Sequence, residues 1–154
     1  MSYLKSQSGT YALLMKLPGR RVIRIGRRGD GVFPQGYYTY IGSAFGSGGV
    51  CARLGRHLVH TKKMHWHIDY LREHVEIIAI WCTYDPLQRE HQWSASFQQM
   101  ASASTPFSRF GASDCKCPSH LFLTHSVPDV RLFYERLKIL DPKHEPILVY
   151  KHES

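Results

Sequence analysis

Residues 36–60 read GYYTYIGSAFGSGGVCARLGRHLVH, and this stretch decides the predicted fold. Its first part, 37–41, is an uninterrupted aromatic and β-branched run, which predicts a strand over 37–42. The glycines within 46–49 disfavour a continued strand or helix, and they allow backbone to pass close to a bulky group. From Val50 onward, apolar residues at every fourth position predict a helix. The stretch therefore predicts a strand, a glycine-rich turn and a helix.

The other face of this predicted helix is basic. Arg53, Arg56, His57 and His60 follow one another at offsets of three, four and seven from Arg53, so they share one face. The tyrosine-bearing end of the strand and the glycine turn should lie beside that face. We therefore expect a phosphate group to bind here.

Length and charge narrow the classes of protein to consider. The chain has 154 residues and 43% hydrophobic content, which predicts one globular domain spanning residues 1–154. Its net charge is +8, and residues 1–74 carry twelve Lys and Arg against three Asp and Glu. Such a basic half favours a polyanionic partner. The longest apolar runs are too short for a membrane span or a secretory signal, so the four cysteines are expected as reduced thiols in the cytoplasm.

The first third of the chain is predicted to begin with a β-hairpin. Residues 9–17, GTYALLMKL, predict a first strand, and Pro18-Gly19 a turn. The apolar residues between Val22 and Ile25 alternate with arginines, which predicts a second strand that completes a hairpin over 9–26. The segment 27–36 is glycine-rich and contains a proline, so we expect a loop.

The remainder alternates between predicted helices and strands. VEIIAIWC at 75–82 is the most hydrophobic strand candidate and is expected near the centre of the sheet. The fold class is therefore α/β, with a small, mainly antiparallel sheet of three to five strands flanked by helices. The other predicted elements are a helix from about residue 66, a helix over 87–103, a loop over 104–119, a short strand over 120–124, a helix over 127–140 and an edge strand at 147–150.

Two triplets in this framework resemble a known family. Gly9-Thr10-Tyr11 and Tyr40-Ile41-Gly42 are similar to the two signature triplets of the GIY-YIG endonuclease superfamily. In that superfamily each triplet lies on a strand of a small sheet, and a required arginine follows on a helix. Arg53 matches that arginine, and Glu90 matches the glutamate that holds a single divalent ion on a later helix. The resemblance implies a phosphodiester hydrolase that uses Mg²⁺ or Mn²⁺.

The resemblance extends to a particular subgroup of this superfamily. The matching segments are Arg56-His57-Leu58, Lys62-Lys63, residues 65–71 (HWHIDYL) and residues 110–122 (FGASDCKCPSHLF). They occur in the expected order, so the motif-bearing core covers about residues 9–124, followed by a C-terminal helix and tail at 125–154. Subgroup members are sometimes fused to endonuclease III-like DNA glycosylases. DNA is accordingly the expected substrate, and a DNA-repair protein an expected partner.

The candidate catalytic residues are those that phosphodiester hydrolysis requires. Arg53 offers a planar fork to two phosphate oxygens. Glu90 would hold the metal ion, which polarises the phosphate and lowers the pKa of a bound water. Tyr11 or Tyr40 would take the proton of that water, if nearby cations lower the tyrosine pKa, or would orient the water. His57 would relay a proton or contact the adjacent phosphate.

A second group of residues is expected to contact nucleic acid rather than perform chemistry. His65 and His67, with Asp69, would line the cleft or form a buried hydrogen-bond network. The sequence contains no base-recognition module, so the affinity is expected to come mainly from the phosphate backbone. The group comprises Gly42, Ser43, Arg56, Lys62, Lys63, His65 and His67.

Two alternatives remain open on the sequence alone. Ser43 stands where the excision-repair branch of the superfamily has a lysine, which allows a non-catalytic domain that binds nucleic acid through the same phosphate cradle. Cys115, Cys117 and His120 form a compact set of soft ligands, which allows a zinc-stabilised interaction domain.

Overall fold

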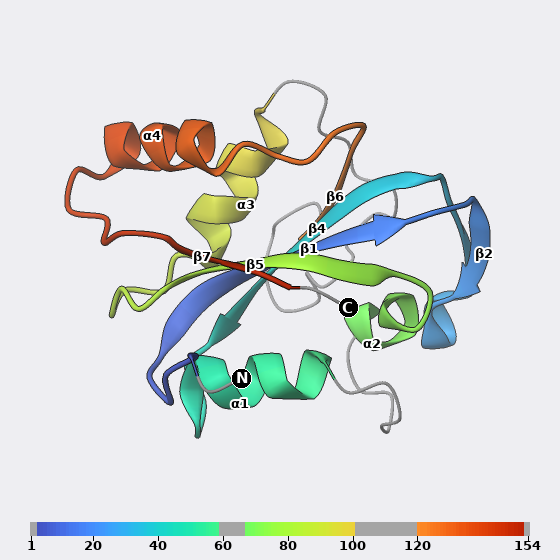
Figure 1. The fold of residues 1–154 in the computed structure, drawn as a ribbon, viewed down its shortest axis with the longest axis horizontal. Coiled ribbons are helices and arrows are strands. Elements are labelled where there is room, and N and C mark those ends of the chain that lie inside the picture. The colour runs from blue at the N-terminus through green and yellow to red at the C-terminus, as the bar shows by residue number, and fades with distance from the viewer. Residues whose placement is uncertain (1–2, 59–66, 101–119, 153–154) are drawn as a thin grey trace.

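The structure, a computed structural model, describes residues 3–58, 67–100 and 120–152. Within these ranges the chain forms one five-stranded sheet, one two-stranded sheet, four α-helices and a short 3₁₀ helix at Gly26–Arg28 (Figure 1). The strands are β1 (Gly9–Leu17), β2 (Arg21–Arg24), β3 (Asp30–Phe33), β4 (Gly36–Ala44), β5 (Glu76–Thr83), β6 (Leu121–Thr124) and β7 (Leu148–Lys151). The helices are α1 (Gly49–His57), α2 (His67–Arg72), α3 (Glu90–Gln98) and α4 (Val130–Leu140).

The five-stranded sheet is built around β1. Its strand order is β6-β4-β1-β5-β7, and each neighbouring pair is antiparallel. β1 and β4 pair along their whole length, with Tyr11 opposite Gly42 and Leu13 opposite Tyr40. The two triplets therefore lie on adjacent strands in the middle of the sheet and meet where Tyr11 faces Gly42. The predicted α/β class with a small antiparallel sheet is confirmed.

Helices cover both faces of this sheet. Figure 1 shows α3 and α4 on one face and α1 and α2 on the other. Alternate residues of β1 enter two separate cores: Tyr11, Leu13 and Met15 point toward α1 and α2, whereas Ala12 and Leu14 point toward α3 and α4. This explains why the β1 sequence is a continuous apolar run, since a strand buried on both faces has no polar side.

The predicted hairpin over 9–26 is wrong. β2 pairs with β3 in a separate two-stranded sheet, and β3 lies within the segment 27–36 that was expected to be loop. β1 cannot accept β2 because β4 and β5 occupy both of its edges. Ile23 and Phe33 of the small sheet are buried, so this sheet still contributes to the core.

The other predicted elements are present with different limits. β5 lies next to the central strand, between β1 and β7, and β7 is the expected edge strand. α4 begins at Val130 rather than at 127, because the Asp129 carboxylate caps the helix by accepting from the backbone N–H of Arg131 at 2.9 Å. α3 is shorter than the predicted 87–103, and the predicted loop 104–119 lies outside the described residues.

Candidate active site

The first tyrosine of the site needs the glycine that faces it. Tyr11 and Gly42 are register partners on β1 and β4. A Cβ atom on Gly42 would lie 2.4 Å from the Tyr11 hydroxyl oxygen, so any larger residue would displace the phenol. Gly42 is buried. In this structure Gly42 makes room for Tyr11, and the nucleic-acid contact expected for it from the sequence stays a prediction.

Tyr11 forms a buried pair with His57, the last residue of α1. Its hydroxyl and the His57 Nε2 atom are 2.7 Å apart and share a hydrogen bond. The Tyr40 ring packs edge-on against the same imidazole, with centroids 6.0 Å apart. Strand-to-strand pairing and the single face of α1 thus bring together three of the predicted catalytic residues.

Arg53 lies one helical turn before His57 and interacts with the Tyr11 hydroxyl by charge and by hydrogen bonding. A guanidinium can only donate, so the Tyr11 oxygen accepts from Arg53, and the Tyr11 hydroxyl donates to His57 in the tautomer whose Nε2 carries no proton. Arg53 also lines a pocket of about 140 Å³ beside the glycine turn. It therefore connects the buried tyrosine and histidine to the surface.

Burial keeps both tyrosines protonated. It raises the pKa of Tyr11 well above the ordinary value for tyrosine, and the opposing charge and hydrogen bond of Arg53 do not reverse the shift. Burial also raises the pKa of Tyr40, and the neighbouring Tyr11 and Glu90 raise it further. Arg53 therefore does not bring the pKa of either tyrosine below its ordinary value. Each phenol acts here as a neutral hydrogen-bonding group.

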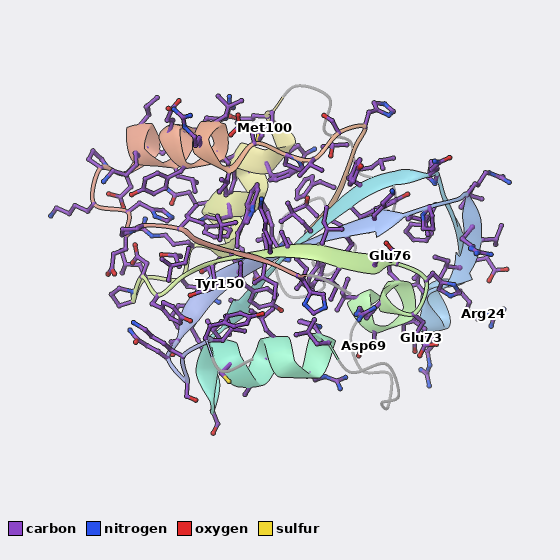
Figure 2. The ribbon with its side chains drawn as sticks, viewed as in Figure 1. Arg24, Asp69, Glu73, Glu76, Met100 and Tyr150 are labelled. Carbon is purple, nitrogen blue, oxygen red and sulfur yellow. The ribbon has the colours of Figure 1, made fainter. Side chains whose placement is uncertain are left out.

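Arg56 is bound by an acidic partner. Its Nη2 donates to Asp69 Oδ2 of α2 at 2.7 Å, and the Asp69 side chain is 0% exposed against 27% for Arg56. Figure 2 shows Asp69 between α2 and the end of α1. Asp69 thus makes a buried hydrogen bond with Arg56, which joins two helices. The network expected for Asp69 with His65 and His67, and the nucleic-acid contact expected for Arg56, stay predictions.

The start of α3 is fixed to the first triplet. The backbone N–H of Arg89 donates to the Thr10 hydroxyl at 3.1 Å, and both residues are buried. The Arg89 guanidinium is held by the carboxylates of Asp85 and Asp141, the latter at 2.6 Å. These contacts hold in place Glu90, the first residue of α3, whose charge acts on both Tyr11 and Tyr40.

Two imidazoles lie beside Glu90. The ligand atoms of Glu90, His91 and His120 are all within 4.8 Å of one another, and His120 Nδ1 is 3.7 Å from Glu90 Oε1. The second triplet positions His120, because Ile41 N–H donates to the His120 carbonyl at 2.9 Å. One carboxylate and two imidazoles are a donor set that fits a divalent cation.

The first amides of α1, which follow the glycine turn, are satisfied within the chain. The N–H groups of Gly49, Val50, Cys51 and Ala52 all donate to backbone carbonyls, and two of these carbonyls belong to Lys5 and Gln7. Gly49 has a φ of 59°, and a Cβ there would lie 2.4 Å from the Gln7 oxygen. The backbone does pass close to something bulky, as predicted, but that partner is the N-terminal segment of the same chain.

Residues 10–138 match the family described as "Domain of unknown function DUF123", which is most of the chain. The chain belongs to this family. Comparison of the DUF123 chain with curated proteins and with solved structures gave no match. In the described part of the DUF123 chain, no helix combines the length and the apolar character that crossing a membrane requires.

Ser43 of the DUF123 chain makes a polar contact near α3. Its hydroxyl accepts from the Gln88 side chain at 3.1 Å, two residues before Glu90. Ser43 is thus bonded to the segment that leads into α3. Lys62, Lys63 and His65 lie outside the described residues, as does the side chain of His67.

The sequence did not identify Thr10 or His91 as site residues. His120 was predicted only as a possible zinc ligand with Cys115 and Cys117, or as a loop residue near the site. Thr10 stands where the superfamily triplet has isoleucine, which was the available signal for it. His91 had the weak signal of directly following Glu90. Cys115 and Cys117 lie outside the described residues, so the zinc alternative remains a prediction.

Proposed function

We propose that this DUF123 chain is a divalent-metal-dependent endonuclease of the GIY-YIG type that hydrolyses DNA phosphodiester bonds. One observation carries the proposal: Tyr11, Tyr40, Arg53 and His57 meet at one place, within electrostatic reach of Glu90. The two triplets that suggested the superfamily lie on adjacent strands, and the implied arginine and glutamate converge on them. Scattered positions for these residues would have argued against an active site.

Arg53 would bind the scissile phosphate. It is half-buried, lines the 140 Å³ pocket and reaches the Tyr11 hydroxyl, so it can hold two phosphate oxygens while keeping its orientation. A guanidinium aimed at the charge that develops on the phosphate stabilises the transition state. Removal of one such group typically lowers kcat by about 10²–10³-fold.

The neutral tyrosines would orient and relay rather than act as anionic bases. Tyr40 is 7% exposed against 0% for Tyr11, so we assign to Tyr40 the hydrogen bond that orients the attacking water. The attacking water would give its proton to the Tyr11 oxygen while Tyr11 gives its own proton to His57 Nε2, so that His57 becomes the imidazolium that holds the proton. This route does not require either phenol to ionise.

Glu90 would hold the Mg²⁺ or Mn²⁺ ion, and its neighbours His91 and His120 provide further donor atoms in a set that fits a divalent cation. When bound, the ion would polarise the phosphate and lower the pKa of a coordinated water. The protein's own contribution is to fix the donors, through the bonds from Arg89 to Thr10 and from Ile41 to His120.

The basic half of the chain supports DNA as the partner. The excess of Lys and Arg in residues 1–74 supplies sequence-independent affinity for phosphates. A cytoplasmic location and a DNA-repair partner follow from the subgroup resemblance and from the reduced thiols, and they are part of the same proposal.

The test is cleavage of a supercoiled plasmid and of labelled single- and double-stranded DNA, with Mg²⁺ or Mn²⁺ and with chelator. Wild type should cut only with metal, while Arg53→Ala and Glu90→Gln should lose activity by about 10²-fold or more. Arg131→Ala, on an exposed turn of α4, is the matched control and should cut as wild type does.

The competing candidate is a non-catalytic nucleic-acid-binding domain. It is favoured by the protonated state of both tyrosines and by Ser43 in place of lysine. Wild type that binds DNA with a steep dependence on salt, but never cuts with any divalent ion, would establish that function and reject the enzyme.

A further inference from the structure

We propose that Glu90, His91 and His120 form a three-ligand site that takes a first-row transition cation in preference to Mg²⁺. This inference builds on the proposed function, because it concerns the metal of the same site. It can nevertheless be tested without nucleic acid.

The chemistry of the donors carries the selectivity. Mg²⁺ prefers oxygen ligands and keeps most of its waters, so a single carboxylate suits it. Imidazole nitrogen suits Zn²⁺, Co²⁺, Ni²⁺ and Fe²⁺, whose affinity for nitrogen ligands exceeds that of the hard cations. Glu90 alone would favour Mg²⁺. Two imidazoles within 4.8 Å of its carboxylate therefore shift the metal preference of the site toward a transition cation.

The donor atoms of Glu90 and His120 are already as close together as two ligands of one ion. His120 Nδ1 and Glu90 Oε1 are 3.7 Å apart, within the roughly 4.2 Å that two ligands at about 2.1 Å from one ion can span. The rings of His91 and His120 have centroids 6.2 Å apart. His91 is exposed, so a rotation of its side chain can adjust its nitrogen without disturbing the core.

The burial pattern leaves one side of the site open. His120 is buried, Glu90 is half-buried and His91 is exposed, so the donors run from the interior to solvent. Three protein ligands leave coordination positions for water or a phosphate oxygen, as in catalytic rather than structural sites.

The backbone anchors both ligand-bearing segments to the triplets. Ile41 N–H donates to the His120 carbonyl, and the Thr10 hydroxyl accepts from Arg89 N–H, one residue before Glu90. The donors therefore come from two segments thirty residues apart that the central strands hold in register. This arrangement is preorganised for an ion rather than assembled by it.

The test is a titration of the metal-free protein with Co²⁺. The visible absorption of bound Co²⁺ measures the binding, and Mg²⁺ is then added as a competitor. One Co²⁺ should bind, and a large excess of Mg²⁺ should not displace it. His91→Gln and His120→Gln should each weaken Co²⁺ binding at least about tenfold. His125→Gln, an exposed histidine that lies outside the proposed ligand set, should bind as wild type does.

A Cys115→Ser/Cys117→Ser variant separates this site from the cysteine loop. It should retain the Co²⁺ absorption, and a spectrum dominated by thiolate charge transfer that this variant abolishes would overturn the proposal. Equal affinity for Mg²⁺, or unchanged Co²⁺ binding in His91→Gln, would do so as well. His91 is exposed, so its replacement leaves the fold intact even if His120→Gln does not fold.

The two proposals fail in different ways. Protein that binds Co²⁺ through the histidines but never cuts DNA keeps the metal site and loses the nuclease. Wild type that cuts DNA with Mg²⁺ but binds Co²⁺ no more tightly than His91→Gln and His120→Gln do keeps the nuclease and loses the transition-metal site.

Discussion

The hydroxyl of Thr10 accepts a hydrogen bond from the backbone N–H of Arg89, 79 residues away in the chain. The donor stands immediately before the first residue of α3 and belongs to a buried residue. The middle residue of the first triplet thus fixes the helix that carries Glu90. An isoleucine at this position could not make the bond, so this chain uses a hydroxyl to attach α3 to the sheet.

Thr10→Val should therefore destabilise the protein and weaken metal binding together. The replacement keeps the shape but leaves the Arg89 N–H buried without its acceptor, which costs about 1–3 kcal/mol. Urea unfolding measures the loss, and Thr10→Ser, which retains the hydroxyl, should recover most of it. Equal stability of the valine variant and wild type would show that the bond does not hold α3.

Gly42→Ala should be destabilising because its Cβ would meet the Tyr11 phenol at 2.4 Å. We expect a loss of about 1–3 kcal/mol, typical of an overpacked core, and displacement of Tyr11 from His57. Thermal or urea unfolding provides the measurement. Gly46→Ala is the matched control, since a Cβ there has open space around it; a similar loss in both variants would refute the steric explanation.

Arg56→Ala should lower stability more than it lowers DNA affinity. The substitution leaves the fully buried Asp69 carboxylate without its 2.7 Å partner, at a cost of about 1–3 kcal/mol, because water reaches the exposed part of this pair. The double variant Arg56→Ala/Asp69→Ala should recover part of the loss. In DNA binding, Arg53→Ala should reduce the salt slope by about one, and Arg56→Ala should leave it unchanged.

A fall in pH should weaken the packing of α3 against the segment after α4. His144 accepts from the Trp93 indole N–H at 2.9 Å through Nε2, and its Nδ1 lies 2.6 Å from the Glu145 carbonyl, so the fold requires the neutral imidazole. Burial lowers the pKa of His144 in the folded state. The stability it confers is present above the unfolded pKa of about 6.5 and is lost as pH falls below that value.

Melting temperatures between pH 5 and 8 test this dependence. Wild type should lose stability below about pH 6.5, whereas His144→Gln should be less stable at pH 7 but vary less over the same range. Parallel curves for the two proteins would place the titration on another group.

Much of the sheet was predictable because its strands have strong local signals. The predicted limits of β1 match those observed, and the aromatic run of β4 and the apolar run of β5 identified the strands beside it. The offsets within α1 also predicted correctly that Arg53 and His57 share a face. These features depend on residues that are close in the sequence.

The errors concern partners that are distant in the sequence. The sequence predicted that β2 pairs with β1, the strand just before it. The distant strands β4 and β5 occupy both edges of β1 instead. His120 could not be placed beside Glu90, because pairing of β6 with β4 brings it there. The partner of Arg56 is Asp69 on the next helix, which the spacing of residues within α1 could not reveal. The raised pKa of each tyrosine likewise comes from burial by distant segments, which outweighs the lowering effect of Arg53.

The segment before β1 bears directly on how the protein should be handled. Lys5 and Gln7 supply the carbonyls that receive the first amides of α1, and Tyr3 stacks on Tyr150 of β7 with centroids 4.6 Å apart. Proteolytic cleavage after Gln7 would release α1, which bears Arg53 and His57, although the remaining chain would still contain every residue named for chemistry. Residues 3–7 therefore have to stay intact in any protein used to measure activity.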